Sequence, residues 1–393
     1  MKQDGQTIDG SQRVQSIDSL RGLAILGIFL VNMPDFHSPF LHINPLEWWR
    51  DNPDRIFYIL VDLFAQASFY PMFAFLFGFG AVILAKRAQD RNQSFPLVFS
   101  RRLVVLLVIG CVHAFFIWHG DILINYALFG FFFLLFYRMS GITLLWLGSL
   151  LFAIPALLFS LLMMLIYFTI PDEAVIPTNF EMVKASIEAY QLGTFMEIFQ
   201  QRFVEWYMVN NLGNGIILFF SIFPLFLIGA GFAKLKWLEK TKEHQRKLAM
   251  IAVVCLVIGS LLKASPYIAN YNYFTVSLQD MIGGPVISIF YITAIVLLLQ
   301  NKSIAKIVSL LANVGRLSMS NYLLQSIIGT LLFYSYGFGL YDKISFTTGV
   351  VLVVVIYFLQ LVLSTIWLKY YRIGPVEYIW RFATYGTRPM MKK

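Results

Sequence analysis

The feature that most constrains this chain is a series of uncharged apolar runs, several of them about 20 residues long. A helix of that length crosses roughly 30 Å of hydrocarbon and satisfies its own backbone hydrogen bonds there. Hydrophobic residues make up 59% of the chain and charged residues 13%, which is more apolar surface than a water-soluble fold can bury. The sequence therefore predicts an all-α polytopic helical bundle in a membrane. It excludes soluble enzymes, disulfide-rich secreted proteins and transmembrane barrels.

Windows of apolar residues predict about ten transmembrane helices. They cover residues 20–34, 57–85, 103–118, 122–137, 142–170, 211–233, 248–264, 276–299, 315–335 and 346–368. Most of the 30 Lys and Arg residues fall in the two tails and in the connections that follow even-numbered spans. Because Lys and Arg are enriched on the cytoplasmic side, this alternation predicts that both termini are cytoplasmic.

A single membrane domain is expected over residues 1–393. Within it we expect a cytoplasmic N-terminal segment at 1–18, an extracytoplasmic amphipathic insertion at 171–210 and a basic cytoplasmic tail at 369–393. The net charge of +9 needs no nucleic acid as partner, since a basic face against anionic membrane lipid explains it. The same cations are also suited to the phosphates of a cytosolic cofactor. The oligomeric state is left open, a homodimer included.

Bound metal and disulfide bonds are not expected. The two cysteines, Cys111 and Cys255, lie inside apolar runs where they behave as small hydrophobic residues. No spacing of histidine, cysteine and carboxylate residues resembles a zinc site.

Polar residues within the predicted spans are the candidate functional groups, because each costs about 2.5 to 3.5 kcal/mol at the bilayer centre unless it is paired or hydrated. In the first span, Arg21 and Asn32 are eleven residues apart, which places them on one helix face about 16 Å apart. This spacing predicts a polar line that points into the bundle. The alternative is that Arg21 snorkels to the interface beside Asp18 and that Asn32 only bonds to a neighbouring helix.

The second span contains Asp62 and Gln66, one helical turn apart and followed by Pro71. An acid and an amide on one face, with a proline kink below them, suit a water-filled cavity. The alternative is a carboxylate that is hydrated at the lipid headgroups.

The third span begins with Arg101 and Arg102, and His113 lies about three turns above Arg102 on the same face. Beyond it, His119 and Asp121 are expected to pair at the outer mouth, as general-base chemistry on an external hydroxyl or amine requires. For His113, a hydrogen-bonded core histidine is the alternative.

Four segments, taken in order, resemble the bacterial YeiB-like family of inner-membrane proteins, which contain a domain of unknown function. They are Ser16-Ile-Asp-Ser-Leu-Arg-Gly-Leu-Ala with Asn32, the stretch from Arg101-Arg102 through His113 to Gly120-Asp121-Ile-Leu and Tyr126-Ala-Leu, Gly315-Arg-Leu-Ser-Met-Ser-Asn321-Tyr-Leu-Leu-Gln, and Gly374-Pro-Val-Glu377-Tyr-Ile-Trp380-Arg381. The resemblance covers nearly the whole chain. It implies a multi-pass protein of the bacterial cytoplasmic membrane.

The Asp-x-x-Arg-Gly start of the first span also resembles the transmembrane acyltransferase group, which includes heparan-glucosaminide acetyltransferases and acyltransferase-3 type enzymes. This resemblance implies that an acyl group passes from cytosolic acyl-CoA to an acceptor across the membrane, a glycan or a lipid headgroup, with the help of a buried histidine. In the polysaccharide-modifying branch the histidine stands where this chain has Asn32. The base is then expected among His37, His42, His113 and His119.

On this resemblance the acyl-CoA phosphates are expected to bind four basic residues: Arg21, Arg101, Arg102 and Arg316. His113 or His119 would deprotonate the acceptor, Asp121 or Asp62 would orient the imidazole, and Asn32 would donate to the developing oxyanion. The alternative is a small-solute transporter or exporter without covalent chemistry. Both hypotheses require a hydrated shaft between these polar side chains.

Overall fold

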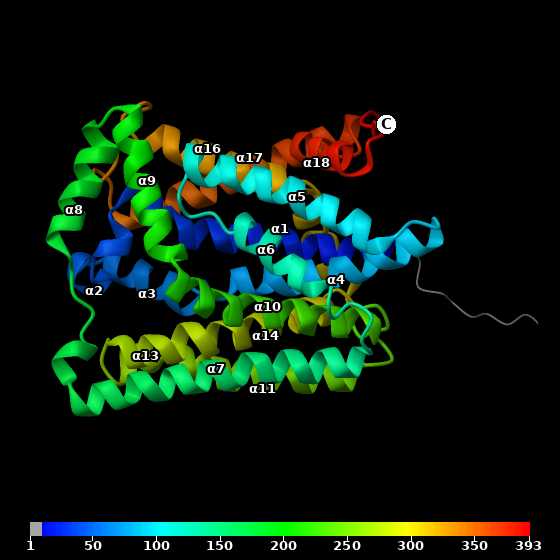
Figure 1. Cartoon of the computed structure of the whole chain (residues 1–393), viewed down its shortest axis with the longest axis horizontal. Helices are drawn as coiled ribbons and strands as arrows, with labels where there is room; N and C mark the ends of the chain where they lie inside the picture. Colours follow the sequence, from blue (N-terminus) through cyan, green and yellow to red (C-terminus); the bar gives the residue numbers. More distant parts are fainter. Residues whose placement is uncertain (1–9) are drawn as a thin grey trace, which may run out of the picture.

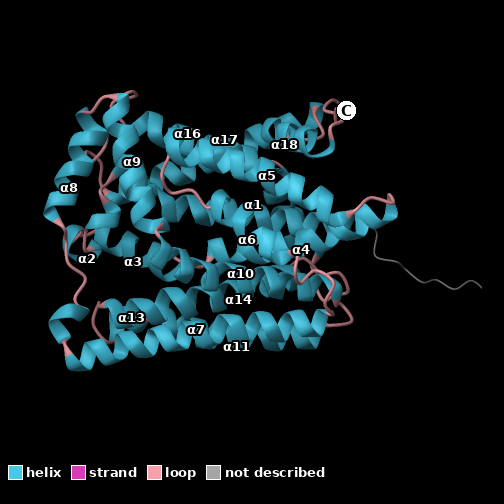
Figure 2. Cartoon of the chain, in the orientation of Figure 1, coloured by secondary structure: helices cyan, strands magenta, loops and turns pink. Residues whose placement is uncertain are grey.

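The computed structural model describes residues 10–393, so residues 1–9 of the predicted N-terminal segment lie outside the described part. The described residues form helices joined by short loops, with no strand among them (Figure 2). Eight helical segments of this part are long and apolar enough to cross a membrane. The prediction of an all-α polytopic bundle is confirmed.

Five of these segments are single helices: α1 (Gly10–His37), α7 (Gly141–Thr169), α10 (Leu212–Lys234), α11 (Gln245–Lys263) and α17 (Phe346–Tyr370). The other three join consecutive elements: α3 (Asp54–Phe64) with α4 (Phe69–Asp90), α5 (Phe95–Val112) with the π-helical turn His113–Ile117, and α13 (Tyr273–Ser277) with α14 (Gly284–Leu298) through the π-helical turn Leu278–Gly283. α12 (Ser265–Ile268) is a single turn between α11 and α13.

Two predicted spans are shorter helices. α6 (Leu123–Phe133) has 11 residues and α16 (Ser318–Phe333) has 16. At 1.5 Å per residue they are about 16 and 24 Å long, less than the roughly 30 Å of hydrocarbon. Hydropathy windows do not separate short helices buried between longer ones from helices that face lipid, so the ten predicted spans become eight long segments and two short helices.

α15 (Lys302–Arg316) is a helix that the sequence analysis assigned to a connection and to the start of the ninth span. It packs closely along α1 because two glycines let the backbones approach. A Cβ atom at Gly22 would lie 2.0 Å from the carbonyl oxygen of Leu311, and one at Gly315 would lie 1.8 Å from that of Asp18. Side chains at either glycine would therefore separate the two helices.

The kink expected at Pro71 lies elsewhere. The chain breaks between α3 and α4, where Ala67 has a φ of 53°, and Pro71 falls in the first turn of α4. A proline in the first turn removes no hydrogen bond that the helix needs. The break therefore comes from the turn at residues 65–68 and not from the proline.

The long helices run side by side, and the connections gather at two opposite ends (Figure 1). We call one the basic end, defined by the α4–α5 connection, the α10–α11 connection and α18 (Pro375–Tyr385). The other is the insertion end, defined by α2 (Pro45–Trp48), α8 (Phe180–Ile187) and α9 (Phe195–Asn210). α7 and α11 form one edge of the bundle, and most of their side chains are unburied, as expected for helices that face lipid.

Candidate functional site

A histidine, a carboxylate and a hydroxyl meet where α5 ends. The π-helical turn that follows Val112 places His113 between α16 and the start of α6. His113 Nδ1 lies 2.8 Å from Asp121 Oδ1, and its Nε2 lies 2.9 Å from Ser326 Oγ. The other carboxylate oxygen of Asp121 accepts the backbone N–H of Ile124 at 2.8 Å.

The carboxylate determines which ring nitrogen of His113 carries the proton. An ionised Asp121 has only acceptors, so Nδ1 must donate to it. Nε2 then keeps its lone pair and accepts the hydroxyl proton of Ser326. A hydroxyl next to a base, with the base oriented by a carboxylate, is the arrangement that activates an oxygen nucleophile.

This group is sealed from solvent. The side chains of His113 and Asp121 are 0% exposed, and Ser326 is buried as well. The imidazole packs against Trp118 and Tyr322, with ring centroids 6.2 and 5.1 Å away. The predicted hydrated shaft therefore does not reach His113 in this conformation.

His119 belongs to a second group, so the predicted His119–Asp121 pair is wrong. Its Nε2 lies 2.9 Å from Asp35 Oδ2 and its Nδ1 lies 3.1 Å from Glu205 Oε2. The loop between the π-helical turn and α6 directs Asp121 towards α5 and α16, and it directs His119 towards α1 and α9. Of the two histidines, Asp121 therefore pairs with His113.

Glu205 is the centre of this second group. Its carboxylate accepts hydrogen bonds from Tyr190 at 2.5 Å, from Gln201 at 2.8 Å and from Ser186. His42 Nε2 lies 3.4 Å from the same carboxylate. α8 and α9 thus turn charged and polar side chains towards the bundle, not only towards the outer surface as an amphipathic insertion suggests. The sequence analysis missed Glu205 as a site residue, although its spacing from Arg202 on α9 could have indicated a shared buried face.

Opposite charges shift the ionisation of this group. Burial lowers the pKa of His119, but the Asp35 and Glu205 carboxylates outweigh burial and hold that pKa above its usual 6.5. Burial raises the pKa of Glu205, but His119 and the hydrogen bonds from His42, Ser186 and Tyr190 bring it down to about 2. Both ring nitrogens of His119 face carboxylate oxygens, which only accept hydrogen bonds, so this site favours the cationic imidazole.

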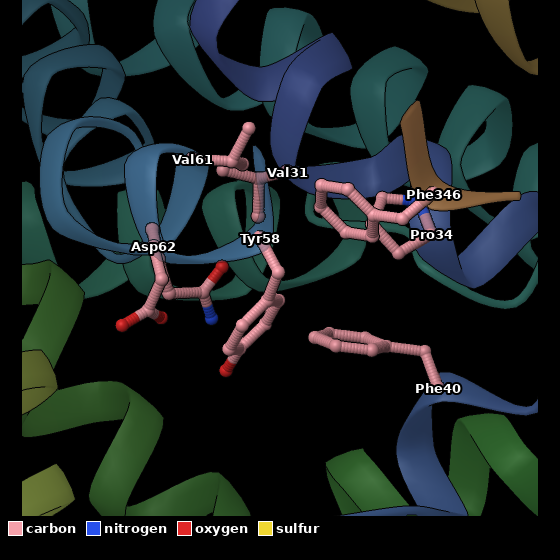
Figure 3. A pocket seen from close by; sticks show the side chains of 8 residues that line it. Val31, Pro34, Phe40, Tyr58, Val61, Asp62 and Phe346 are labelled. Carbon is pink, nitrogen blue, oxygen red and sulfur yellow. The ribbon is translucent and has the colours of Figure 1, made fainter. Parts of the chain in front are cut away.

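Asp62 lies in a third group and orients neither histidine. It accepts hydrogen bonds from Tyr267 at 2.6 Å and from Gln279. A cavity of about 10 Å³ adjoins it, bounded by α1, α3 and α17 (Figure 3), with room for about one water. Its lining residues are Val31, Pro34, Phe40, Tyr58, Val61, Asp62, Gln66 and Phe346.

Asn32 is half-buried on α1. Within the described part of the chain, no hydrogen bond joins it to His113 or to His119. Its role as an oxyanion donor stays a prediction.

Three of the four predicted phosphate-binding arginines gather at the basic end. Arg21 pairs with Asp18 at 3.4 Å, and Arg316 is close enough to interact electrostatically with the same carboxylate. Arg102 lies 3.6 Å above the ring centroid of Trp380 and within electrostatic range of Arg21. Arg101 is exposed and is not among the groups that interact electrostatically with Asp18 or Arg102.

Arg381 completes this cluster, since it lies within electrostatic range of both Asp18 and Arg102. The sequence analysis placed Arg381 in the basic tail without assigning it to the phosphate site. We call Arg21, Arg102, Arg316 and Arg381 the arginine cluster.

All four segments that resemble the YeiB-like family meet near the arginine cluster. The first and third touch at Gly22 and Gly315. The fourth contacts the third through Glu377, whose carboxylate accepts the backbone N–H of Met319 at 2.8 Å and that of Ser320 at 3.1 Å. It contacts the second through Trp380, which donates to the Arg102 carbonyl at 2.9 Å.

The fold and the site define a polytopic α-helical membrane protein with a buried histidine, carboxylate and hydroxyl group. A family model described as "Protein of unknown function (DUF418)" matches residues 232–387. The uncharacterized protein YxaH of Bacillus subtilis (strain 168) is 34% identical, over 98% of this chain and 97% of the relative. The uncharacterized protein YeiB of Escherichia coli (strain K12) is 28% identical, over 95% of this chain and 96% of the relative. The chain belongs to the DUF418 family, and the YeiB-like resemblance is confirmed.

Proposed function

We propose that this protein is an acyltransferase of the bacterial cytoplasmic membrane. It transfers an acyl group from cytosolic acyl-CoA to a hydroxyl or amine of a glycan or lipid headgroup on the opposite side. The observation that supports this function is the hydrogen-bonded series Asp121–His113–Ser326. His113 is the general base, and Asp121 holds its tautomer and stabilises the imidazolium that forms when it accepts a proton.

The arginine cluster supports the choice of acyl-CoA as donor substrate. Four guanidinium groups with Asp18 and Glu377 as neighbouring carboxylates leave an excess of positive charge suited to phosphate groups. Arg102 and His113 are eleven residues, or about three turns, apart in the same helical segment, hence on one face and about 16 Å apart. In a conformation that opens the sealed His113 site, phosphates bound at the arginines would let the flexible pantetheine arm extend along this face, with the thioester near His113.

The proposal is tested by CoA release from acetyl-, octanoyl- and palmitoyl-CoA. The purified full-length protein is reconstituted in liposomes that contain bacterial lipid extract, and free thiol is followed with a thiol-reactive dye. His113→Asn is expected to slow release by about 10²- to 10⁴-fold, because the base is lost. His244→Asn, at the half-buried histidine before α11, is the matched control and is expected to behave as wild type. Equal rates for His113→Asn and wild type would remove His113 from the mechanism.

Small-solute transport is a second candidate, and the cavity beside Asp62 favours it. Near it, Lys263 Nζ lies 3.8 Å from Asp280 Oδ1, so this part of the bundle holds ionisable groups that are separate from His113. A transporter would show solute flux coupled to a proton gradient, without CoA release. Asp62→Asn would abolish that flux, whereas in an acyltransferase it would leave CoA release near the wild-type rate.

A further inference from the structure

Ser326 occupies the position that an acceptor would need in a direct transfer. If His113 deprotonated the acceptor itself, its free nitrogen would face a space for the acceptor hydroxyl. Instead Nε2 is 2.9 Å from Ser326 Oγ, and both side chains are buried. The first hydroxyl available to the base is therefore that of the protein.

The position of Ser326 along α16 is also informative. It is about 12 Å from Ser318, at the end of α16 nearer the arginine cluster, and about 10 Å from Phe333, at the other end of the helix. Phe333 packs near His37, the last residue of α1. Ser326 thus lies near the middle of α16, between the end that is nearer the arginine cluster and the end that packs near His37.

We propose that Ser326 is an acyl carrier and that transfer proceeds through an acyl-Ser326 ester. This inference rests on the proposed acyltransferase function and names the covalent step within it. A covalent carrier removes the need for donor and acceptor to meet in the sealed site. Donor and acceptor come from opposite ends and need not occupy the buried space at the same time.

In the first half-reaction, Ser326 Oγ attacks the thioester carbonyl carbon and its proton moves to His113 Nε2. The carbon–sulfur bond then breaks, and the CoA sulfur takes the proton from Nε2 and leaves as the thiol. In the second half-reaction, the acceptor hydroxyl or amine gives its proton to Nε2 and attacks the ester carbonyl. The bond to Oγ breaks, the proton returns to Ser326, and Asp121 stabilises the imidazolium in both halves.

The test uses the full-length protein with acetyl-, octanoyl- or palmitoyl-CoA and no acceptor. After an acid quench, intact and peptide mass spectrometry are expected to find one acyl group on Ser326, formed with a burst of about one equivalent of CoA. Ser326→Ala is expected to lose both the adduct and the burst. Ser326→Cys is expected to form a thioester that neutral hydroxylamine removes. Ser288→Ala, at a buried serine on α14 whose hydroxyl donates to the Pro285 carbonyl of the same helix, is the matched control and keeps the adduct.

The possible results separate the carrier from the function. If Ser326→Ala transfers acyl groups at the wild-type rate while His113→Asn is inactive, transfer is direct, and only the carrier is overturned. An acyl adduct at another residue also overturns the carrier. If the wild-type protein releases no CoA from any of the three donors, the proposed function fails and the carrier fails with it. Thermal unfolding of each variant in detergent shows whether a loss of labelling reflects a loss of folding, and the Ser326→Cys result decides where Ser326→Ala does not fold.

Discussion

His113 and His119 are six residues apart in the chain, and both are buried beside carboxylates. His113 has a carboxylate on one ring nitrogen and a hydroxyl on the other. His119 has a carboxylate at each nitrogen. The first arrangement leaves a lone pair for proton transfer, whereas the second holds the imidazole as a cation.

This difference in hydrogen-bond partners indicates which histidine can act as a base. A histidine between two carboxylates loses two attractive contacts when it gives up its proton, so it stabilises structure better than it exchanges protons. His119 connects α1 through Asp35 with α9 through Glu205. We therefore assign it to holding the insertion end on the bundle, and we assign proton transfer to His113.

The largest effect is expected for Asp121→Asn. The amide can donate to Nδ1, which favours the tautomer with the proton on Nε2 and removes the acceptor for the Ser326 proton. CoA release is expected to fall by on the order of 10⁴-fold, with folding retained. Asp172→Asn, at an exposed carboxylate before α8, is the matched control. A comparable loss in both variants would mean that the Asp121–His113 contact has no special role.

A large loss of stability is expected for Glu205→Gln. This change leaves the His119 cation with Asp35 alone and is expected to lower the free energy of unfolding by about 3 kcal/mol, as measured by thermal or denaturant unfolding in detergent. Glu181→Gln, at an exposed residue on α8, is expected to change it by less than about 0.5 kcal/mol. At temperatures where Glu205→Gln is folded, CoA release should stay near the wild-type rate. A selective loss of catalysis without loss of stability would reverse our assignment of the two histidines.

A smaller effect is expected on the donor side of the His113 site, where two neighbouring arginines form a matched pair. Arg102 lies over Trp380 in the arginine cluster, whereas Arg101 is exposed. Arg102→Gln is expected to raise the KM for acyl-CoA by about tenfold through the loss of one charged phosphate contact. Arg101→Gln is expected to leave it within about twofold. Equal KM values for the two variants would show that the arginine cluster does not bind the donor.

The smallest effect is expected in the pH dependence of the free energy of unfolding. The folded-state pKa of His119 is raised, so its contribution is fully present below pH 6.5 and is lost as pH rises through the raised value. The pKa of Glu205 is lowered to about 2, so its contribution is present above pH 4.5 and is lost as pH falls towards 2. Unfolding of the wild type should therefore become easier on the alkaline side. In His119→Gln that alkaline loss should be smaller, and an unchanged profile would contradict a cationic His119.

Much of the fold could be predicted from local sequence, because an apolar run in lipid must satisfy its backbone hydrogen bonds within its own helix. The runs at 142–170 and 346–368 correspond to α7 and α17 within a few residues. The runs at 122–137 and 315–335 correspond to the shorter helices α6 and α16. Whether these two cross the membrane stays a prediction, because apolar character is the same whether a helix faces lipid or is enclosed by other helices. α15 was missed as a separate helix because it is amphipathic and packs on α1 through Gly22 and Gly315.

The candidate residues His113 and Asp121 were found because an ionisable side chain within an apolar run has a cost that only pairing offsets. Their pairing was one of the alternatives that the sequence left open. The sequence could not select it, since the turn after Val112 adopts the wider π-helical form, which helps to set the direction of the His113 side chain. The sequence did not indicate Ser326 as a site residue. A serine adds little free-energy cost to a membrane helix, because its hydroxyl commonly bonds to the backbone of its own helix.

By itself, the sequence determined that this protein is a membrane-embedded helical bundle, with its basic residues segregated from its apolar runs and with histidines in polar positions. Only the tertiary structure decided which of those histidines meets a hydroxyl and which is held between carboxylates. The partners are far apart in the chain, since His113 and Ser326 are 213 positions apart, and helix packing alone brings them within hydrogen-bond distance. Hydrophobicity is a property of each segment, whereas proton transfer depends on distances between segments.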